Sequence, residues 1–186
     1  MFRLISAAIM TTALTVSSAS PLSVRDLDGK TWTPLSPARG DIHLLVFVTV
    51  DCPVANRYAS EIGRIAADYR AKGVKTLLIY ADATLGTPRV TTHMKTYFPG
   101  LPAVIDKDFS VTSTVGATVT PEAAIFTQAG RTYRGRVDDL YVSIGQARRQ
   151  ATRHDVRDVL DAIVSGRTSP EAEAQAFGCF IERIKR

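Results

Sequence analysis

The sequence predicts an α/β fold in which a central mixed β-sheet is flanked by helices. The continuous apolar run 43–50 (HLLVFVTV) is typical of a strand that is buried on both faces, and 74–80 is predicted to be a second buried strand. The segment between them, 53–72, repeats apolar residues at helical spacing and stops at Gly73. Later segments continue the alternation of strand and helix and then add a β-hairpin, so we expect helices on both faces of the sheet.

Length and composition agree with one compact domain. The 186 residues are 45% hydrophobic and 22% charged, which is enough apolar surface for a core without disulfide staples. Only two cysteines are present, so a disulfide-rich mini-protein is excluded. No internal repeat of about 20 to 50 residues is visible, which argues against a solenoid.

The remaining elements follow from turn and cap signals. A short N-terminal hairpin is predicted around Asp28-Gly29, with strands at 22–25 and 30–32. After the second buried strand we expect a helix at 89–98, a strand at 103–105 and a helix at 109–115 that Gly116 ends.

The C-terminal third begins with a predicted hairpin whose strands are 123–126 and 132–137. A last helix is expected to begin at Thr152, whose hydroxyl would form a capping box with Asp155, and to end at Gly166. These boundaries give one domain over 20–166 and an extension over 167–186 that carries the second cysteine.

Residues 1–19 have the pattern of a cleaved signal peptide. A cationic start is followed by thirteen apolar or small residues, 4–16, and then by small residues before a cut at Ala19/Ser20. The run is too short to span a bilayer, and a buried N-terminal helix is the alternative. We predict export to the periplasm or the extracellular space, with no membrane span after cleavage and an oxidising environment for the cysteines.

The formal charge of +5 and the pI of about 9.4 are interpreted as a solvated basic surface. The excess positive charge lacks interleaved aromatic residues, so we predict no nucleic-acid partner; it lies at Arg148, Arg149, Arg153, Arg183, Lys185 and Arg186. Phosphate-loop, dinucleotide-binding and nucleophile-elbow motifs are absent. We predict no cofactor and no metal site.

Cys52 follows the first buried strand and precedes Pro53, which suits the first turn of a helix. Unpaired backbone N–H groups and the helix dipole favour a thiolate there, and the thiolate is the form that attacks disulfides and peroxides. Arg57 would add positive charge, whereas Asp51 would act in the opposite direction. The alternative is an inert buried thiol.

Four blocks of the sequence resemble exported redoxins of the thioredoxin fold that are called peroxiredoxin-like (AhpC/TSA-related). They are 47–58 (FVTVDCPVANRY), 120–122 (TPE), 133–139 (YRGRVDD) and 178–181 (GCFI), in matching order and spacing over about residues 40 to 181. The resemblance implies a thioredoxin-like fold with Cys52 as nucleophile. It also implies a substrate groove that is formed by Thr49, Pro53, Arg57, Thr120 and Pro121.

The sequence departs from the patterns of the better-known redoxins. Thioredoxins carry C-x-x-C, whereas Ala55 stands at the second position here, and Val46 stands where thioredoxins have a buried acid. Peroxiredoxins carry P-x-x-x-T-x-x-C, of which Thr49 is present, but Leu45 replaces the proline. Arginines that could bind a peroxide are restricted to the late hairpin, where we expect Arg134 and Arg136 on the surface, paired with Asp138 and Asp139.

Cys179 lies 127 positions after Cys52, in the polar extension. If the extension folds back, Cys179 could resolve a sulfenic acid or mixed disulfide on Cys52, which needs Cα atoms within about 7 Å of each other. A static disulfide and two unpaired thiols are the alternatives.

Three functions remain open. The first is an exported thiol redox enzyme that acts on a partner protein's disulfide, a small disulfide or a hydroperoxide, with Cys52 as nucleophile and Cys179 as resolver. The second is a copper-binding module similar to Sco proteins, with Cys52, Cys179 and His93 as soft ligands, although His93 is expected on a surface helix. The third is a non-catalytic redoxin that binds a partner beside Pro121.

Overall fold

The computed structural model describes residues 20–170 and 172–182, so the predicted signal segment lies outside the described residues. Its helices are α1 (Pro53–Arg70), α2 (Thr87–Tyr97), α3 (Ser110–Val115) and α4 (Asp155–Val164). The strands are β1 (Val24–Arg25), β2 (Thr31–Trp32), β3 (Ile42–Val48), β4 (Val74–Tyr80), β5 (Ala103–Ile105), β6 (Val119–Thr120), β7 (Glu122–Thr127), β8 (Gly130–Gly135), β9 (Tyr141–Ser143), β10 (Gln146–Ala147), β11 (Glu173–Ala174) and β12 (Cys179–Phe180).

The central sheet is mixed, as predicted, with the strand order β11-β8-β7-β3-β4-β5. The buried strand β3 pairs in parallel with β4 and antiparallel with β7, so the most apolar run of the sequence lies in the middle of the sheet. Strands β1 and β2 form the predicted N-terminal hairpin, and β7 and β8 form the late hairpin. The bounds of β4 and β5 match the prediction residue for residue.

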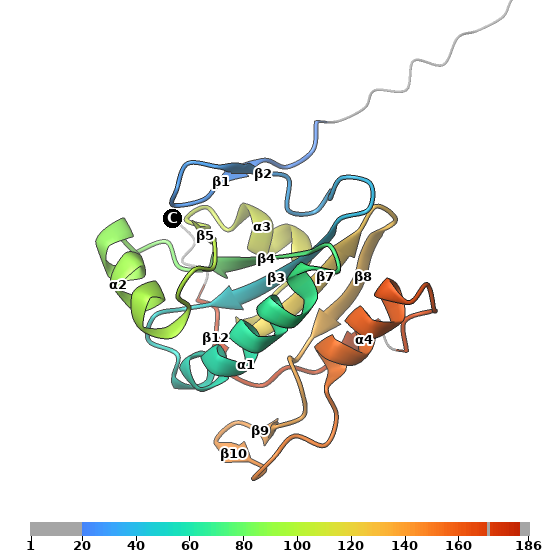
Figure 1. Ribbon diagram of the computed structural model, residues 1–186. Coiled ribbons are helices and arrows are strands. Elements are labelled where there is room, and N and C mark those ends of the chain that lie inside the picture. The colour runs from blue at the N-terminus through green and yellow to red at the C-terminus, as the bar shows by residue number, and fades with distance from the viewer. Residues whose placement is uncertain (1–19, 171, 183–186) are drawn as a thin grey trace, which may run out of the picture.

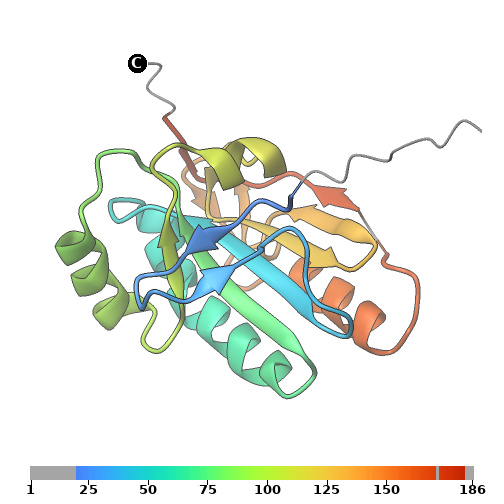
Figure 2. The same cartoon turned by 90° about the horizontal axis from the view of Figure 1, so that it is seen from above.

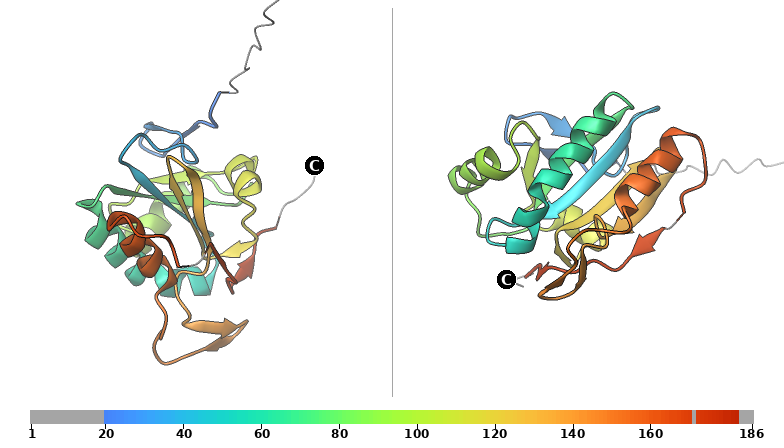
Figure 3. Two further views of the ribbon diagram at one scale, coloured as in Figure 1. Left: turned by 90° about the vertical axis from the view of Figure 1, so that its right-hand side faces the viewer. Right: turned by 60° about the horizontal axis from the view of Figure 1, so that its bottom comes forward.

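Two apolar layers cover the two faces of this sheet. On β3, Leu44 and Val46 point toward the core beneath α1 and α4, whereas Leu45 and Phe47 point to the opposite core beneath α3 and the N-terminal hairpin. Figures 1 and 2 show α1 and α4 on one side of the sheet and α3 with β1 and β2 on the other. The right panel of Figure 3 shows α1 and α4 side by side.

Helix α1 forms where local signals agree. Cys52 occupies its N-cap, Pro53 its first position, and Gly73 follows its end with φ +84°. Its buried residues recur every three or four positions and face the sheet: Ala55, Tyr58, Ala59, Ile62, Ile65, Ala66 and Tyr69.

The predicted start of the last helix is wrong. Helix α4 begins at Asp155, and no side chain caps it at His154. The Thr152 hydroxyl and backbone N–H both donate to the Asp139 carboxylate at 2.6 Å, so Thr152 closes a loop instead of a helix.

The predicted partners of the hairpin arginines are also wrong. Arg134 pairs with Glu122 and Glu173 at 3.5 and 3.4 Å, and Arg136 pairs with Asp155 at 2.9 Å. Both arginines are partly buried rather than surface arms. The carboxylates that were expected as partners are occupied elsewhere: Asp138 accepts from Tyr58, and Asp139 from Thr152 and Arg153.

Several short strands have no counterpart in the sequence prediction. Strands β9 and β10 form a hairpin that projects below the body of the protein in Figure 1 and in the left panel of Figure 3. The C-terminal extension contributes β11, which pairs in parallel with β8, and β12, which pairs antiparallel with β6. In the described part of the chain, no helix is long and apolar enough to cross a membrane.

Candidate functional site

Cys52 lies at the junction of β3 and α1, as the sequence predicts. Its side chain is 1% exposed and accepts a hydrogen bond from the Ala55 backbone N–H at 3.4 Å. An unpaired N–H of the first helical turn is therefore directed at the sulfur, where it stabilises negative charge. Ala55 takes the position at which a C-x-x-C motif would place its second thiol.

The strand before Pro121 forms the wall opposite the Cys52 thiol. Strand β6 ends at Thr120, the Thr120–Pro121 bond is cis, and both residues are buried. The Cys52 thiol donates to the Thr120 carbonyl oxygen at 2.9 Å. The Thr120 hydroxyl is fully buried and has no hydrogen-bond partner among the described residues, so it is free to rotate.

The second cysteine reaches this place from the other end of the chain. In the β12–β6 pair, Cys179 lies directly opposite Thr120, whose carbonyl accepts from the Cys52 thiol. Cys179 packs against the same apolar cluster as Cys52. Both residues are free thiols. Figure 1 shows β12 at the end of α1 where Cys52 is located.

The two thiols differ in acidity. Burial alone would raise the pKa of Cys52, but hydrogen bonds from Cys179, Thr120 and the Ala55 N–H outweigh it and hold this pKa below the ordinary thiol value. The Thr120 carbonyl favours the thiol form, whereas the rotatable Thr120 hydroxyl favours the thiolate. Burial, followed by the hydrogen bond to Cys52, raises the pKa of Cys179 to about 12. Cys52 is thus the more acidic thiol of the pair.

The other predicted groove residues are placed differently. Pro53 is exposed at the first position of α1, and Thr49 is half-buried in the turn before Cys52. Arg57 is exposed and lies 5.9 Å over the ring of Tyr141, away from the thiol. The positive charge that the sequence suggested for Cys52 therefore comes from backbone N–H groups rather than from Arg57.

Sequence reasoning missed Glu122, the residue after Pro121. Its side chain is only 6% exposed, and it accepts from the backbone N–H of Thr118 at 2.8 Å, while Arg134 lies 3.5 Å away. The carboxylate thereby fixes the loop that carries β6. An acidic residue directly after a buried Thr-Pro was the signal available in the sequence.

His93 is buried, contrary to the surface position that the sequence suggested. Its Nδ1 interacts with the Tyr80 hydroxyl and its Nε2 with the Asn56 side-chain oxygen, both at 2.8 Å. Burial lowers its pKa. Within residues 20–170 and 172–182, no group of three or more His, Cys, Asp or Glu side chains could hold a metal ion, so His93 does not complete a site with the two cysteines.

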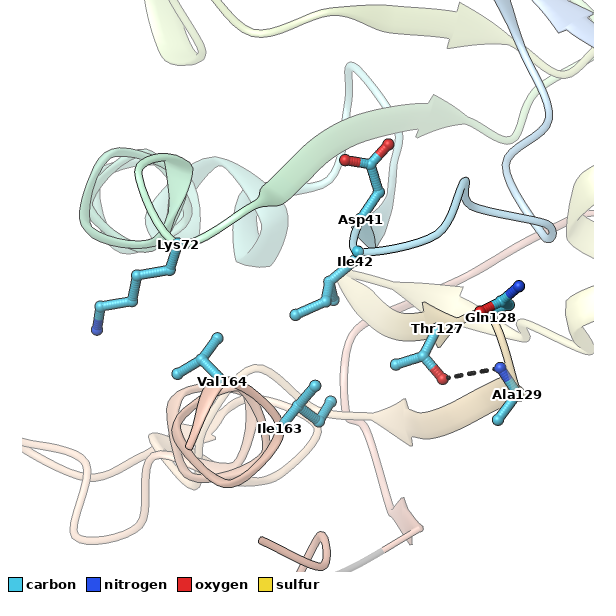
Figure 4. A pocket seen from close by; sticks show the side chains of 9 residues that line it. Asp41, Ile42, Lys72, Thr127, Gln128, Ala129, Ile163 and Val164 are labelled. Carbon is cyan, nitrogen blue, oxygen red and sulfur yellow. Dashed lines mark hydrogen bonds between the residues drawn. The ribbon is translucent and has the colours of Figure 1, made fainter. Parts of the chain in front are cut away.

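A larger pocket lies away from the cysteines. Its volume is about 1000 Å³, and Figure 4 shows Ile42, Ile163 and Val164 around it, with Lys72 at one side. Ile42 begins β3, whereas Cys52 follows the end of that strand. The length of β3 thus separates this pocket from the thiols.

Cys52 is the N-cap of the helix that follows a central strand of a mixed sheet, and it faces a loop with a cis-proline. This is the arrangement of a thioredoxin-fold protein. Comparison with known proteins agrees with this class. No family model matches the chain, and no curated protein sequence matches it.

Solved structures match over most of the chain. An uncharacterized conserved protein from Geobacillus kaustophilus is 25% identical, with a TM-score of 0.75, over 90% of this chain and 91% of that one. A hypothetical protein from Sinorhizobium meliloti 1021 is 24% identical, with a TM-score of 0.70, over 91% and 95%. The dsbF protein of Mycobacterium tuberculosis is 19% identical, with a TM-score of 0.55, over 77% and 94%. The predicted thioredoxin-like fold is confirmed.

Proposed function

We propose that the chain is an exported thiol–disulfide redox protein in which Cys52 is the nucleophile and Cys179 resolves it. The observation that carries this proposal is the strand pair β12–β6, because it brings Cys179 opposite Thr120, whose carbonyl oxygen accepts from the Cys52 thiol at 2.9 Å. A resolving thiol that arrives from a strand replaces the one that a C-x-x-C motif would supply from the helix.

The first step is attack by the Cys52 thiolate. On a disulfide, its sulfur forms a new S–S bond with one sulfur while the other leaves as a thiolate and takes up a proton. On a hydroperoxide, its sulfur takes the terminal oxygen, the O–O bond breaks, and the sulfenic acid and an alcohol or water are formed. The Ala55 N–H stabilises the negative sulfur before this step, and the Thr120 hydroxyl, which has no partner while Cys52 is a thiol, turns to donate to the thiolate.

The second step is attack by Cys179 on the oxidised Cys52 sulfur. Cys179 loses its proton as the Cys52–Cys179 bond forms, and the proton leaves with the second substrate thiol or with the hydroxide of the sulfenic acid, as water. The high pKa of Cys179 keeps it a thiol until Cys52 carries the leaving group. An external dithiol, which takes the two electrons out as its own disulfide, returns the pair to the reduced state.

The structural relatives support a redox role and export. The dsbF structure is described as containing mixed oxidised and reduced forms. Another relative, 16% identical with a TM-score of 0.51, is described as a secreted disulfide oxidoreductase of Mycobacterium tuberculosis. Together with the signal-like segment 1–19, they favour a disulfide exchange partner or a peroxide met outside the cytoplasm.

The test is a non-reducing peptide map of the chain that begins at Ser20, before and after a few equivalents of hydrogen peroxide or oxidised glutathione. We expect a Cys52–Cys179 disulfide that appears with either oxidant and that dithiothreitol reverses. Cys179→Ser should leave a trapped sulfenic acid or glutathione adduct on Cys52, whereas Cys52→Ser should consume neither oxidant.

Two results would contradict the proposal. One is full turnover by Cys52→Ser. The other is a Cys52 thiol that stays free in the wild-type chain under both oxidants, which would favour partner binding without catalysis. In that case the Cys52→Ser, Cys179→Ser double variant would capture partners as well as the wild type does.

A further inference from the structure

The C-terminal extension is held to the domain at two separate places. At the first, β11 lies along β8, where the Arg134 N–H donates to the Ala172 carbonyl at 3.0 Å. At the second, β12 lies along β6, and the Ile181 N–H donates to the Thr118 carbonyl at 2.9 Å. The left panel of Figure 3 shows this segment running along the edge of the domain.

Between the two attachments the extension passes along a cavity. The cavity has a volume of about 430 Å³, and charged side chains of Glu122, Arg134 and Glu173 line it together with residues 174–176 of the extension. The linking residues line this cavity, so the position of Cys179 depends mainly on the β12–β6 attachment.

Side chains of β12 alternate in the manner of a strand with one covered face. Phe180 points outward and is 71% exposed, whereas Ile181 is 9% exposed and belongs to the apolar cluster beneath α3. Cys179 packs against the core cluster that contains Cys52. Ile181 therefore fixes the register that places Cys179 opposite Thr120.

Gly178 determines how closely this segment can approach. A Cβ at position 178 would lie 2.0 Å from the Thr120 carbonyl oxygen and 2.7 Å from its carbon, which no real contact allows. Thr120 cannot retreat cheaply, because its carbonyl accepts from Cys52 and β6 is followed at once by Pro121 and the central sheet. Any side chain at 178 must therefore push the extension away from β6.

We propose that Gly178 is a positioning residue that seats Cys179 against Cys52 and thereby restricts the closed site to small oxidants. This inference rests on the proposed function. With the extension seated, Cys52 is 1% exposed, so its sulfur is closed to a folded partner protein. Exchange with a protein disulfide requires the β12–β6 pair to open, which leaves Cys52 free to form the mixed disulfide and Cys179 to return for the second step.

The experiment compares Gly178→Ala with Gly63→Ala, a control in helix α1 where an added Cβ meets nothing within 4 Å. Two readouts are taken on the reduced chain: the yield of Cys52–Cys179 disulfide in a glutathione redox buffer, and the rate of Cys52 modification by a maleimide attached to a large polymer. In Gly178→Ala we expect the effective concentration of Cys179 at Cys52 to fall by about tenfold or more. The polymer maleimide should react faster by a similar factor, whereas Gly63→Ala should match the wild type.

Circular dichroism and the urea midpoint establish that each variant is folded. Ile181→Ala weakens the same attachment without crowding β6, and it should shift the disulfide yield and the maleimide rate in the same directions. This variant replaces Gly178→Ala in the test if Gly178→Ala does not fold. Wild-type readouts in Gly178→Ala and Ile181→Ala would overturn this inference while leaving the redox proposal intact. Failure of the wild type to form the disulfide would overturn the proposed function itself.

Discussion

Replacing Thr120 by valine isolates the contribution of one hydroxyl to the reactivity of Cys52. The Thr120 hydroxyl is buried and lacks a hydrogen-bond partner in the described residues, and it helps to lower the pKa of Cys52. Valine keeps the shape of threonine and the backbone carbonyl that accepts from the thiol, but it removes the donor to the thiolate. We therefore expect the thiolate to be destabilised, while the geometry of the protonated site stays the same.

The size of the effect follows from the charge on the sulfur. A hydrogen bond to a charged group contributes about 1.5–3 kcal/mol, and 1.36 kcal/mol corresponds to a tenfold change in acidity, so the pKa of Cys52 should rise by about 1 to 2. The folded-state pKa lies below that of the unfolded thiol, so stability increases as pH rises through the folded-state pKa. The valine variant should gain less stability over this pH range. Below it, where Cys52 is protonated, removal of an unpaired buried hydroxyl should stabilise the variant by about 1 kcal/mol.

The assay is the pH dependence of Cys52 carbamidomethylation by iodoacetamide, followed by peptide mapping, together with urea unfolding at low and high pH. Thr76→Val is the matched control, because the Thr76 hydroxyl is the other described side-chain group that is buried without a partner, on β4. It should alter stability without altering the pKa of Cys52. If the pH dependence of Cys52 alkylation is the same in Thr120→Val as in the wild type, the Thr120 hydroxyl does not stabilise the Cys52 thiolate.

Two further predictions concern the charged residues that hold the loops around α4. Asp139→Asn should cost about 2–3 kcal/mol in urea unfolding at neutral pH, because the buried carboxylate accepts from Thr152 and from the Arg153 N–H. Burial would raise the pKa of Asp139, but these hydrogen bonds hold this pKa well below its usual range. The carboxylate therefore stabilises the fold above the ordinary carboxyl pKa, and this stabilisation is lost as the pH falls. In the variant, the free energy of unfolding should depend less on pH in the acid range. Arg136→Met should cost about 3 kcal/mol, because it leaves the buried Asp155 carboxylate without its main partner. An Arg136→Met variant with the wild-type urea midpoint would contradict this account of the pair.

The central sheet could be predicted because its signals are local. The β4 segment 74–80 is apolar except at two positions and is bounded by Gly73 and a polar loop. Both ends of the strand can therefore be predicted from the residues beside them. The same holds for Cys52, whose place before Pro53 and after a buried strand identifies a helix N-terminus without knowledge of the rest of the chain.

The contacts of the extension could not be predicted, because they depend on pairing between distant residues. Strands β11 and β12 have two residues each, too few for any periodicity. Their positions depend on the absence of side chains at Gly135, which lies against Ala174, and at Gly178, which lies against Thr120. A glycine in a sequence does not reveal which backbone will approach it.

The errors around α4 have a similar origin. Thr152 and Asp155 have the spacing of a capping box, and the local pattern is satisfied. Each side chain nevertheless has a stronger distant partner, since Thr152 donates to Asp139 and Asp155 accepts from Arg136. Charge-assisted bonds in a buried setting outweigh a cap that water could replace.

The proposed resolving thiol, Cys179, lies on a strand, and this has a consequence that a C-x-x-C motif does not have. In C-x-x-C the helix fixes the distance between the two sulfurs, so the pair is preserved as long as the helix is. Here the distance between Cys52 and Cys179 is set by the attachment of the extension. A change that opens the β12–β6 pair in the reduced chain should therefore lower the tendency of the two thiols to form a disulfide.

Oxidation must in turn hold the extension in place. A disulfide between residues 127 positions apart would restrict the unfolded chain by about 5 kcal/mol in the chain-entropy model. The strands that it reinforces have two residues each and lie beside a charged cavity, so they belong to the least stable part of the fold. The reduced protein should therefore expose the Cys52 site by local opening, and the oxidised protein should close it, which makes the state of the extension a direct report of the redox state of the pair.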